Sequence, residues 1–500
     1  MWNMSALTIN EQPIHEDTQK QAPLYDALRS YEQSNRTSLH VPGHKDGRVF
    51  DPIGTAHFSE VMKIDTTHSK GIDDLHHPQD FIAEAQRLAA ETFRADHTYF
   101  LVGGSTVGNM STALTLCRPG DKILVQRNMH KSVFHGLMIA GARPIFIAPS
   151  MEATTKVAKM SDISFIKQAL EDHPDAKGVW ITNPNYYGMH QDMTSLARFC
   201  HEREIPLIVD EAHGAHFGLI DEVPPSALSQ GADLVVQSTH KMLPAMTMAS
   251  MLHVQSTFID RERLSQVLGM VQSTSPSYPL LASLDLARRY IATQGAVQLK
   301  DTVKRLEKER RVLSCQLQKL SIWSGSEGVD HMDPLKWIIS CEGVTGYQLL
   351  DMFYEEGCTA EISDPRNICF LFSLSESEED IKKVVTAINT IDKKLQNMSQ
   401  WAEVSSLDME LFAEEGTIHQ PEMPMSEAFH SKRKQVPLKH AVGEICAETV
   451  LPYPPGIPLL TPGEKIITKH VKAINKLKET GAYFQSPSDD SMETLYVVSR

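Results

Sequence analysis

Between positions 98 and 238, short apolar segments alternate with segments whose apolar residues recur at helical spacing. The apolar segments are typical of buried strands and lie at 98–102, 122–126, 144–148, 178–182, 206–210 and 232–238. Strands that alternate with helices build βαβ units and a mostly parallel sheet. The sequence therefore predicts an α/β fold, in which ligands bind beyond the carboxyl ends of the strands.

Polar and aromatic residues follow five of these strands. They are Ser105 and Thr106, Asn128 and His130, Asn183 and Tyr186, Asp210 and His213, and finally Ser238, His240 and Lys241. Taken singly, each of these residues could equally be a surface group. Because the carboxyl ends of parallel strands share one edge of a sheet, we expect them to converge on a single site.

The first strand runs into Gly103-Gly104-Ser105-Thr106, and a helical pattern follows. Glycines let backbone N–H groups approach an anion, a helix N-terminus favours negative charge, and the two hydroxyls can donate further hydrogen bonds. The turn has neither the GK[ST] ending of a Walker loop nor full GxGxxG spacing. It indicates a phosphate cradle of another kind.

Two further strand ends carry the groups that a pyridoxal phosphate (PLP) site most needs. Lys241 follows the strand at 232–238, and Asp210 ends the strand at 206–210. In PLP enzymes a lysine forms a Schiff base with the cofactor, and a carboxylate pairs with its pyridine nitrogen. A lysine alone is more often a surface residue, so the interpretation depends on the other strand ends.

Composition excludes several classes of function. The 500 residues carry a net charge of −15, which argues against a general nucleic-acid binder or a protein that binds anionic membranes. No apolar run is long enough for a membrane span or a signal peptide, so a cytoplasmic protein is expected. The seven cysteines are scattered without metal-binding spacing, which predicts reduced thiols and no metal site.

The length is too great for one hydrophobic core. A long amphipathic helix is expected at about 299–320, followed by a small α+β unit and by a polar stretch that begins as a helix near 397. We therefore expect a flexible N-terminus (1–22) and a major domain with an N-terminal helix and loop (23–300). A bridging helix with a small domain (301–396), a helix and linker (397–437) and a C-terminal segment (438–500) are expected to follow.

Eight motifs in order resemble those of the Orn/Lys/Arg decarboxylases, which are fold-type I PLP enzymes related in fold to aspartate aminotransferase. They are PGHK (42–45), DDLHHP (73–78), FLVGGSTVGN (100–109), NPNYYG (183–188), DEAHGAH (210–216), QSTHK (237–241), TSPSY (274–278) and PYPPGIP (452–458). The likeness covers roughly residues 22–300 and 438–490. In length the chain is similar to the short arginine decarboxylases of Gram-positive bacteria, which lack the N-terminal wing domain.

The resemblance implies a role for each residue of the expected site. Lys241 is implied to hold PLP, Asp210 to pair with the pyridine nitrogen, and His130 to stack on the ring. His213 is implied to lie near the cofactor hydroxyl or the substrate carboxylate. The phosphate is implied to be held by Ser105, Thr106, Ser238 and His240.

The resemblance also implies a basic amino acid as substrate, whose distal cation needs a carboxylate. Glu464 is the leading candidate and Glu448 the second. His44 lies in a Pro-Gly loop that could be an exposed turn or could fold over the pocket. Fold-type I active sites lie between subunits, so at least a homodimer is implied.

The expected reaction is loss of the α-carboxylate of arginine, giving agmatine for polyamine biosynthesis, with lysine or ornithine as the alternative substrates. An aminotransferase remains a second hypothesis, and it would need an arginine in the small domain for the α-carboxylate; Arg366 is the one candidate. A catalytically silent regulator is the third hypothesis, and intact Lys241, Asp210 and His130 argue against it.

Overall fold

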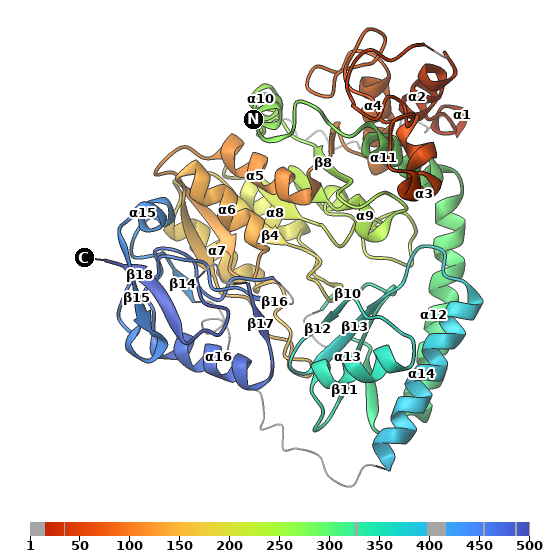
Figure 1. Cartoon of the computed structure of the whole chain (residues 1–500). Coiled ribbons are helices and arrows are strands. Elements are labelled where there is room, and N and C mark those ends of the chain that lie inside the picture. The colour runs from red at the N-terminus through yellow and green to blue at the C-terminus, as the bar shows by residue number, and fades with distance from the viewer. Residues whose placement is uncertain are drawn as a thin grey trace, which may run out of the picture.

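The computed structural model describes residues 16–34, 36–325, 329–397, 417–453, 456–485 and 488–499. An eight-stranded sheet forms its centre (Figure 1). In spatial order the strands are β1 (His97–Leu101), β8 (Ser250–Val254), β7 (Leu234–Gln237), β6 (Leu207–Asp210), β4 (Val179–Thr182), β2 (Lys122–Gln126), β3 (Arg143–Ile147) and β14 (Ile418–His419).

The five strands from β7 to β3 run parallel, as predicted. β8 runs antiparallel to β7, and β14 runs antiparallel to β3 at the other edge. β1 pairs antiparallel with β8 and so runs in the direction of the five central strands. The six predicted strands match the observed ones to within two residues at each end. Their apolar runs were a reliable signal because a parallel strand is buried on both faces.

Each face of the sheet packs against its own hydrophobic core. Neighbouring residues of β6 illustrate this, since Val209 lies in one core and Ile208 in the other. Helices α7 (Ile163–Asp172) and α8 (Thr194–His201) contribute to the first core. The second core receives side chains from α5 (Gly104–Leu116), α6 (Lys131–Ala140) and α10 (Arg261–Val271).

A small domain follows a long helical connection (Figure 1). Helix α11 (Tyr278–Tyr290) continues through one π-helical turn, η2 (Ile291–Gly295), into α12 (Ala296–Gln316). The antiparallel sheet β12-β13-β11-β9 then packs with two helices. Their bounds are β9 (Leu320–Trp323), β11 (Lys336–Cys341), α13 (Gly346–Glu355), β12 (Ile362–Ser363), β13 (Asn367–Leu371) and α14 (Glu378–Gln396).

The predicted α+β unit is therefore present, although α12 ends four residues before the expected position and gives way to β9. The helix expected near 397 falls mostly on 398–416, outside the described residues. Shorter elements complete the chain: α9 (Thr239–Met242), β5 (Met189–His190), β10 (His331–Met332), η1 (Leu228–Gln230) and η3 (Leu438–His440).

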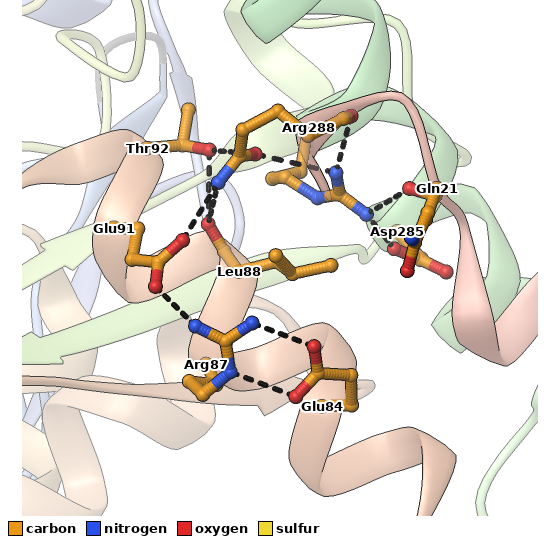
Figure 2. Close-up of polar contacts among 9 residues, drawn as sticks. Gln21, Glu84, Arg87, Leu88, Glu91, Thr92, Asp285 and Arg288 are labelled. Carbon is orange, nitrogen blue, oxygen red and sulfur yellow. Dashed lines mark hydrogen bonds and ion pairs between the residues drawn. The ribbon is translucent and has the colours of Figure 1, made fainter. Parts of the chain in front are cut away.

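The N-terminal helices are fastened to the end of the major domain by one buried arginine (Figure 2). Arg288 of α11 donates to the backbone carbonyls of Gln19 (2.9 Å) and Gln21 (2.7 Å) and pairs with Asp285. Asp285 in turn accepts from the backbone N–H of Leu24 at 3.0 Å. This network fixes the start of α2 (Pro23–Gln33). The other N-terminal helices are α1 (Glu16–Gln19), α3 (Pro52–Met62) and α4 (Phe81–Phe93).

The C-terminal segment has a hydrophobic core of its own, built from residues between Leu438 and Val497. Its elements are α15 (Met425–His430), β15 (Arg433–Pro437), β16 (Pro452–Tyr453), α16 (Thr468–Glu479), β17 (Tyr483–Phe484) and β18 (Thr494–Val498). Figure 1 places it beside α6 and the β14 edge of the main sheet. Within the described ranges, no helix has the length and apolarity that crossing a membrane requires.

A buried ion pair joins this segment to the major domain. Arg127, directly after β2, lies 2.9 Å from Glu464 and donates to the carbonyls of Pro458 (2.6 Å) and Leu459 (3.1 Å). Glu464 also accepts from the N–H of Thr461 at 2.7 Å. Burial alone would raise the pKa of Glu464, but Arg127 and its other partners hold it well below the ordinary value.

We predict that Arg127→Met lowers the free energy of unfolding by about 3–5 kcal/mol, because it leaves the Glu464 carboxylate buried without its cation. Urea denaturation followed by circular dichroism measures the change. The matched control is Lys122→Met at the other end of β2. Lys122 pairs with Asp175 at the surface, so its loss should change stability by less than about 1 kcal/mol.

The same pair predicts a pH dependence. A carboxyl whose pKa is lower in the folded state stabilises the fold above its unfolded pKa, and this contribution is lost as the pH falls. The difference between wild type and Arg127→Met should therefore shrink in acid. A difference that stays constant from neutral pH down to acid denaturation would contradict this assignment.

Candidate functional site

A cavity lies at the carboxyl edge of the parallel strands, where the sequence predicted a site. It brings together every residue that was expected to contact the cofactor, namely Ser105, Thr106, His130, Asp210, His213, Ser238, His240 and Lys241. The remaining lining residues are Gly103, Gly104, Thr182, Tyr186, Ala212, Thr247 and Met248. Residues from five strand ends thus meet within one cavity because the strands are parallel.

Lys241 reaches this cavity from the one-turn helix α9, directly after β7. Its Nζ lies 3.0 Å from Nε2 of His213. Burial lowers the pKa of the Lys241 amine from 10.5 to about 8, and Asp210 opposes that shift. More of this amine is therefore unprotonated near neutral pH than of an ordinary lysine, and the unprotonated form is the one that attacks an aldehyde.

Asp210 ends β6 and is buried. One carboxylate oxygen accepts from the amide of Asn109 at 2.9 Å, and the other accepts from the N–H of Ala212 at 3.1 Å. Burial raises the pKa of Asp210, while the Asn109 hydrogen bond and the Lys241 charge lower it. A cation held against this carboxylate would keep it ionised, as the protonated pyridine nitrogen of PLP would do.

His130 caps the N-terminus of α6, where its Nδ1 accepts from the N–H of Ser132 at 3.2 Å. The ring proton is therefore on Nε2. Burial, with Lys241 nearby, lowers the pKa of His130 to about 3. The ring is consequently neutral, which suits stacking on an aromatic cofactor.

Asn109 connects Asp210 with the His130 cap, since its amide also donates to Oγ of Ser132 at 2.9 Å. Sequence reasoning quoted this asparagine within a motif but gave it no role. The sequence signal that could have identified Asn109 is its polar amide among the apolar residues of α5, where it is buried.

Another group of residues that line the cavity has the composition of a phosphate site. Helix α5 begins there, and Gly104 has φ +75°, a conformation that favours glycine. Ser238 donates to Oγ of Ser105 at 2.7 Å, and Nδ1 of His240 donates to the carbonyl of Ala249 at 3.0 Å. A lysine with a lowered pKa, a buried carboxylate, a neutral ring and this hydroxyl-rich helix start together fit PLP.

The small domain also contacts two residues that line the cavity, Tyr186 and His213, which the sequence did not predict. Lys336, the first residue of β11, is fully buried. Its Nζ donates to the carbonyl of Tyr186 at 2.6 Å and lies 3.1 Å from Nδ1 of His213. The Tyr186 ring packs on His213, with 4.9 Å between the ring centroids.

A close backbone approach allows this contact. Gly188 has φ +85°, and its carbonyl accepts from the N–H of Asp333 at 2.9 Å. A Cβ at Gly188 would lie 2.8 Å from Cβ of Asp333 and 2.9 Å from Cδ of Lys336. Asp333 also meets His216 at 3.1 Å, and both side chains are fully buried. The small domain therefore interlocks with the 183–188 and 210–216 loops.

The three residues proposed for substrate binding lie outside this cavity. Glu464 is already engaged by Arg127, His419 and Thr461, so it is a buried structural acid in this arrangement rather than a free acceptor. Glu448 is also buried, and it accepts from the N–H of Tyr496 at 2.6 Å. Nε2 of His44 lies 3.1 Å from the carboxylate of Asp65 in the N-terminal region. Spacing in sequence could not reveal these partners.

A second, largely apolar cleft shares Thr182 and Tyr186 with the cavity. It is lined by residues from all three parts of the chain, including Val157, Arg366 and Leu459. Arg366 therefore borders this neighbouring cleft and not the Lys241 cavity itself.

Comparisons with known proteins agree with this geometry. The model of the Orn/Lys/Arg decarboxylase major domain matches residues 22–380, and that of the family's C-terminal domain matches residues 407–485. An arginine decarboxylase of Bacillus anthracis is 34% identical over 96% of this chain and 98% of its own length. An uncharacterised protein of Bacillus subtilis is 40% identical over 91% of this chain and 94% of its own.

A solved structure supports the fold. The lysine decarboxylase of Francisella novicida superposes with a TM-score of 0.81 at 21% identity, covering 96% of this chain and 81% of that one. The matched family model extends over the strands, the cavity and the small domain alike. The chain belongs to the Orn/Lys/Arg decarboxylase family of PLP-dependent enzymes.

Proposed function

We propose that this enzyme removes the α-carboxylate of L-arginine as CO₂ and releases agmatine, with lysine and ornithine as poorer substrates. The observation that carries the proposal is the single cavity in which Lys241, Asp210 and His130 face one another. Relatives named arginine decarboxylase from Bacillus anthracis, Bacillus subtilis and Halalkalibacterium halodurans, at 34–35% identity over 96% of this chain, favour arginine among the three substrates.

Each residue of the cavity then has a physical task. Bound PLP supplies the ring that accepts the electron pair left by CO₂. Lys241 holds the cofactor and can carry a proton at Nζ. Asp210 keeps the ring nitrogen cationic, and Asn109 holds the Asp210 carboxylate in place. Ser105, Thr106, Ser238 and His240 hold the phosphate at the start of α5.

The walls around the reacting carbon favour decarboxylation. Burial keeps the pKa of His130 near 3 and that of His213 well below its ordinary value, so both rings are neutral. A neutral wall stabilises a carboxylate less than bulk water does, and the carboxylate leaves as uncharged CO₂. An aminotransferase instead grips this group with arginine, and Arg366 borders the adjacent cleft.

Glu361 of the small domain is our candidate for the distal cation of the substrate. Burial lowers the pKa of Lys241 and of Lys336, and the Glu361 carboxylate acts against both shifts, so its charge acts on both lysines. Within the described ranges no ion pair engages this carboxylate, in contrast to Glu464. A guanidinium can bind such a carboxylate through two N–H groups.

The enzyme is proposed to be a cytoplasmic homodimer or larger homo-oligomer, with polyamine synthesis as the use of agmatine. All seven cysteines are unpaired, as expected of a reducing compartment. Helix α3 buries Met62 alone among its residues, while its Ile53 and Phe58 are 89% and 53% exposed. A second copy of the chain would cover these apolar side chains.

The central test is the product formed with each amino acid. Purified protein incubated separately with arginine, lysine and ornithine should release agmatine fastest, as identified by mass spectrometry. Lys241→Ala should abolish the visible absorbance of bound PLP and the reaction together. Faster release of cadaverine or putrescine would overturn arginine as the preferred substrate. A wild type that cannot take up PLP would overturn the whole proposal.

Glu361→Gln should lower kcat/KM for arginine by about 10- to 100-fold, mainly through KM, because a charge-assisted hydrogen bond to the substrate is lost. PLP absorbance should be unchanged. The matched control is Glu356→Gln, in the same domain, where the carboxylate pairs with Lys394 at the surface. Equal effects of the two substitutions would remove Glu361 from the substrate site.

The double substitution Ile53→Glu with Phe58→Glu should lower the mass in solution toward the 55.9 kDa of one chain, because it replaces two exposed apolar side chains of α3 with charges. Analytical ultracentrifugation measures this mass. Met270→Glu, at a residue of α10 that is 75% exposed, is the control. A wild type that sediments as a monomer would contradict the assembly.

A further inference from the structure

His213 lies between two lysines that come from different domains. Its Nε2 is 3.0 Å from Nζ of Lys241, and its Nδ1 is 3.1 Å from Nζ of Lys336. Both distances are hydrogen-bond distances. Lys336 has no catalytic task in the function proposed above, although it is fully buried.

The hydrogen-bond chemistry of the three groups restricts their protonation. An ammonium group only donates, whereas a neutral imidazole has one donor and one acceptor nitrogen. Burial, followed by the charges of Lys241 and Lys336, keeps the pKa of His213 well below its ordinary value, so the ring is neutral. A neutral His213 cannot accept from two ammonium groups at once. At most one of the two lysines can therefore be a cation bonded to it.

We infer that Lys336 is a positioning residue that holds the cation at one end of the hydrogen-bonded series Lys336–His213–Lys241. His213 then presents Nε2–H to Lys241, and Lys241 remains a free amine. In this state Lys336 donates to Nδ1 of His213 and to the carbonyl of Tyr186. Nε2–H then donates to the lone pair of the Lys241 nitrogen.

The hydrogen-bonded series Lys336–His213–Lys241 can also move one proton. Lys336 can transfer a proton to Nδ1 while Nε2 transfers its proton to Nζ of Lys241. Lys336 then becomes the neutral amine, Lys241 becomes the ammonium, and His213 remains neutral with its proton on Nδ1. The total charge of the three groups is the same before and after the transfer. The geometry thus links the nucleophile to a proton held in the small domain.

The surrounding charges are compatible with a cation on Lys336. Burial lowers the pKa of Lys336, and the carboxylates of Asp333 and Glu361 raise it against that effect. Lys241 faces Asp210, Lys336 and Glu361. His213 is also near His130 and His240, and burial lowers the pKa of both histidines. Asp333 is the nearest of these acids in the chain, three residues before Lys336 in the same turn.

The inference assumes that Lys241 binds PLP, as proposed above, so the test measures cofactor capture without substrate. Cofactor-free protein is mixed with PLP over a range of pH, and the visible absorbance gives the rate of capture. In wild type the rate should rise with the fraction of Lys241 that is unprotonated. Because the Lys336 cation lowers the pKa of Lys241, Lys336→Met should move this rise to higher pH by about one unit. Capture near pH 7 should then be about tenfold slower.

The control is Lys394→Met, which removes an exposed lysine of the same domain and should leave the profile unchanged. Lys336→Gln keeps an N–H donor without the charge, and it should shift the profile as Lys336→Met does. Profiles of folded Lys336 variants that superimpose on wild type would overturn the inference. If neither variant folds, as judged by near-ultraviolet circular dichroism, Lys336 is a structural residue and the inference is overturned as well. Absence of capture in wild type would instead overturn the PLP assignment of Lys241.

Discussion

Burial of charge at one edge of the parallel sheet is the constraint on which the cavity depends. Lys241, Asp210 and His213 are removed from bulk water, and each needs a partner there. Asn109 and the N–H of Ala212 satisfy Asp210, and Lys336 and Lys241 contact the two nitrogens of His213. The same burial shifts their pKa values and produces the amine and the neutral rings that PLP chemistry requires.

Much of this arrangement was readable from the sequence, because parallel strands are continuous apolar runs whose carboxyl ends meet at one edge. The strand segments around Asp210 and Lys241 therefore located the site without any knowledge of side-chain positions. The Gly103-Gly104 turn was equally informative, since a positive φ and a helix start leave few alternatives to glycine.

Contacts between distant parts of the chain were not predictable in this way. Glu464 was the leading candidate for binding the distal cation of the substrate, yet Arg127, 337 positions away, engages it as a buried structural partner. Lys336 is the first residue of β11, and nothing nearby in the sequence indicates that its amine would reach His213. Asn109 was hidden because helical spacing marks a buried face but not the partner of a polar residue on that face.

The interlock around Gly188 has a consequence for motion. The turn from Asp333 to Lys336 is held by the Gly188 carbonyl, by His216 and by His213, which all belong to the major domain. Opening the small domain as a hinged lid would expose the fully buried side chains of Asp333 and His216 and break all three contacts. Movement of the small domain as a hinged lid is therefore opposed by every contact along this seam.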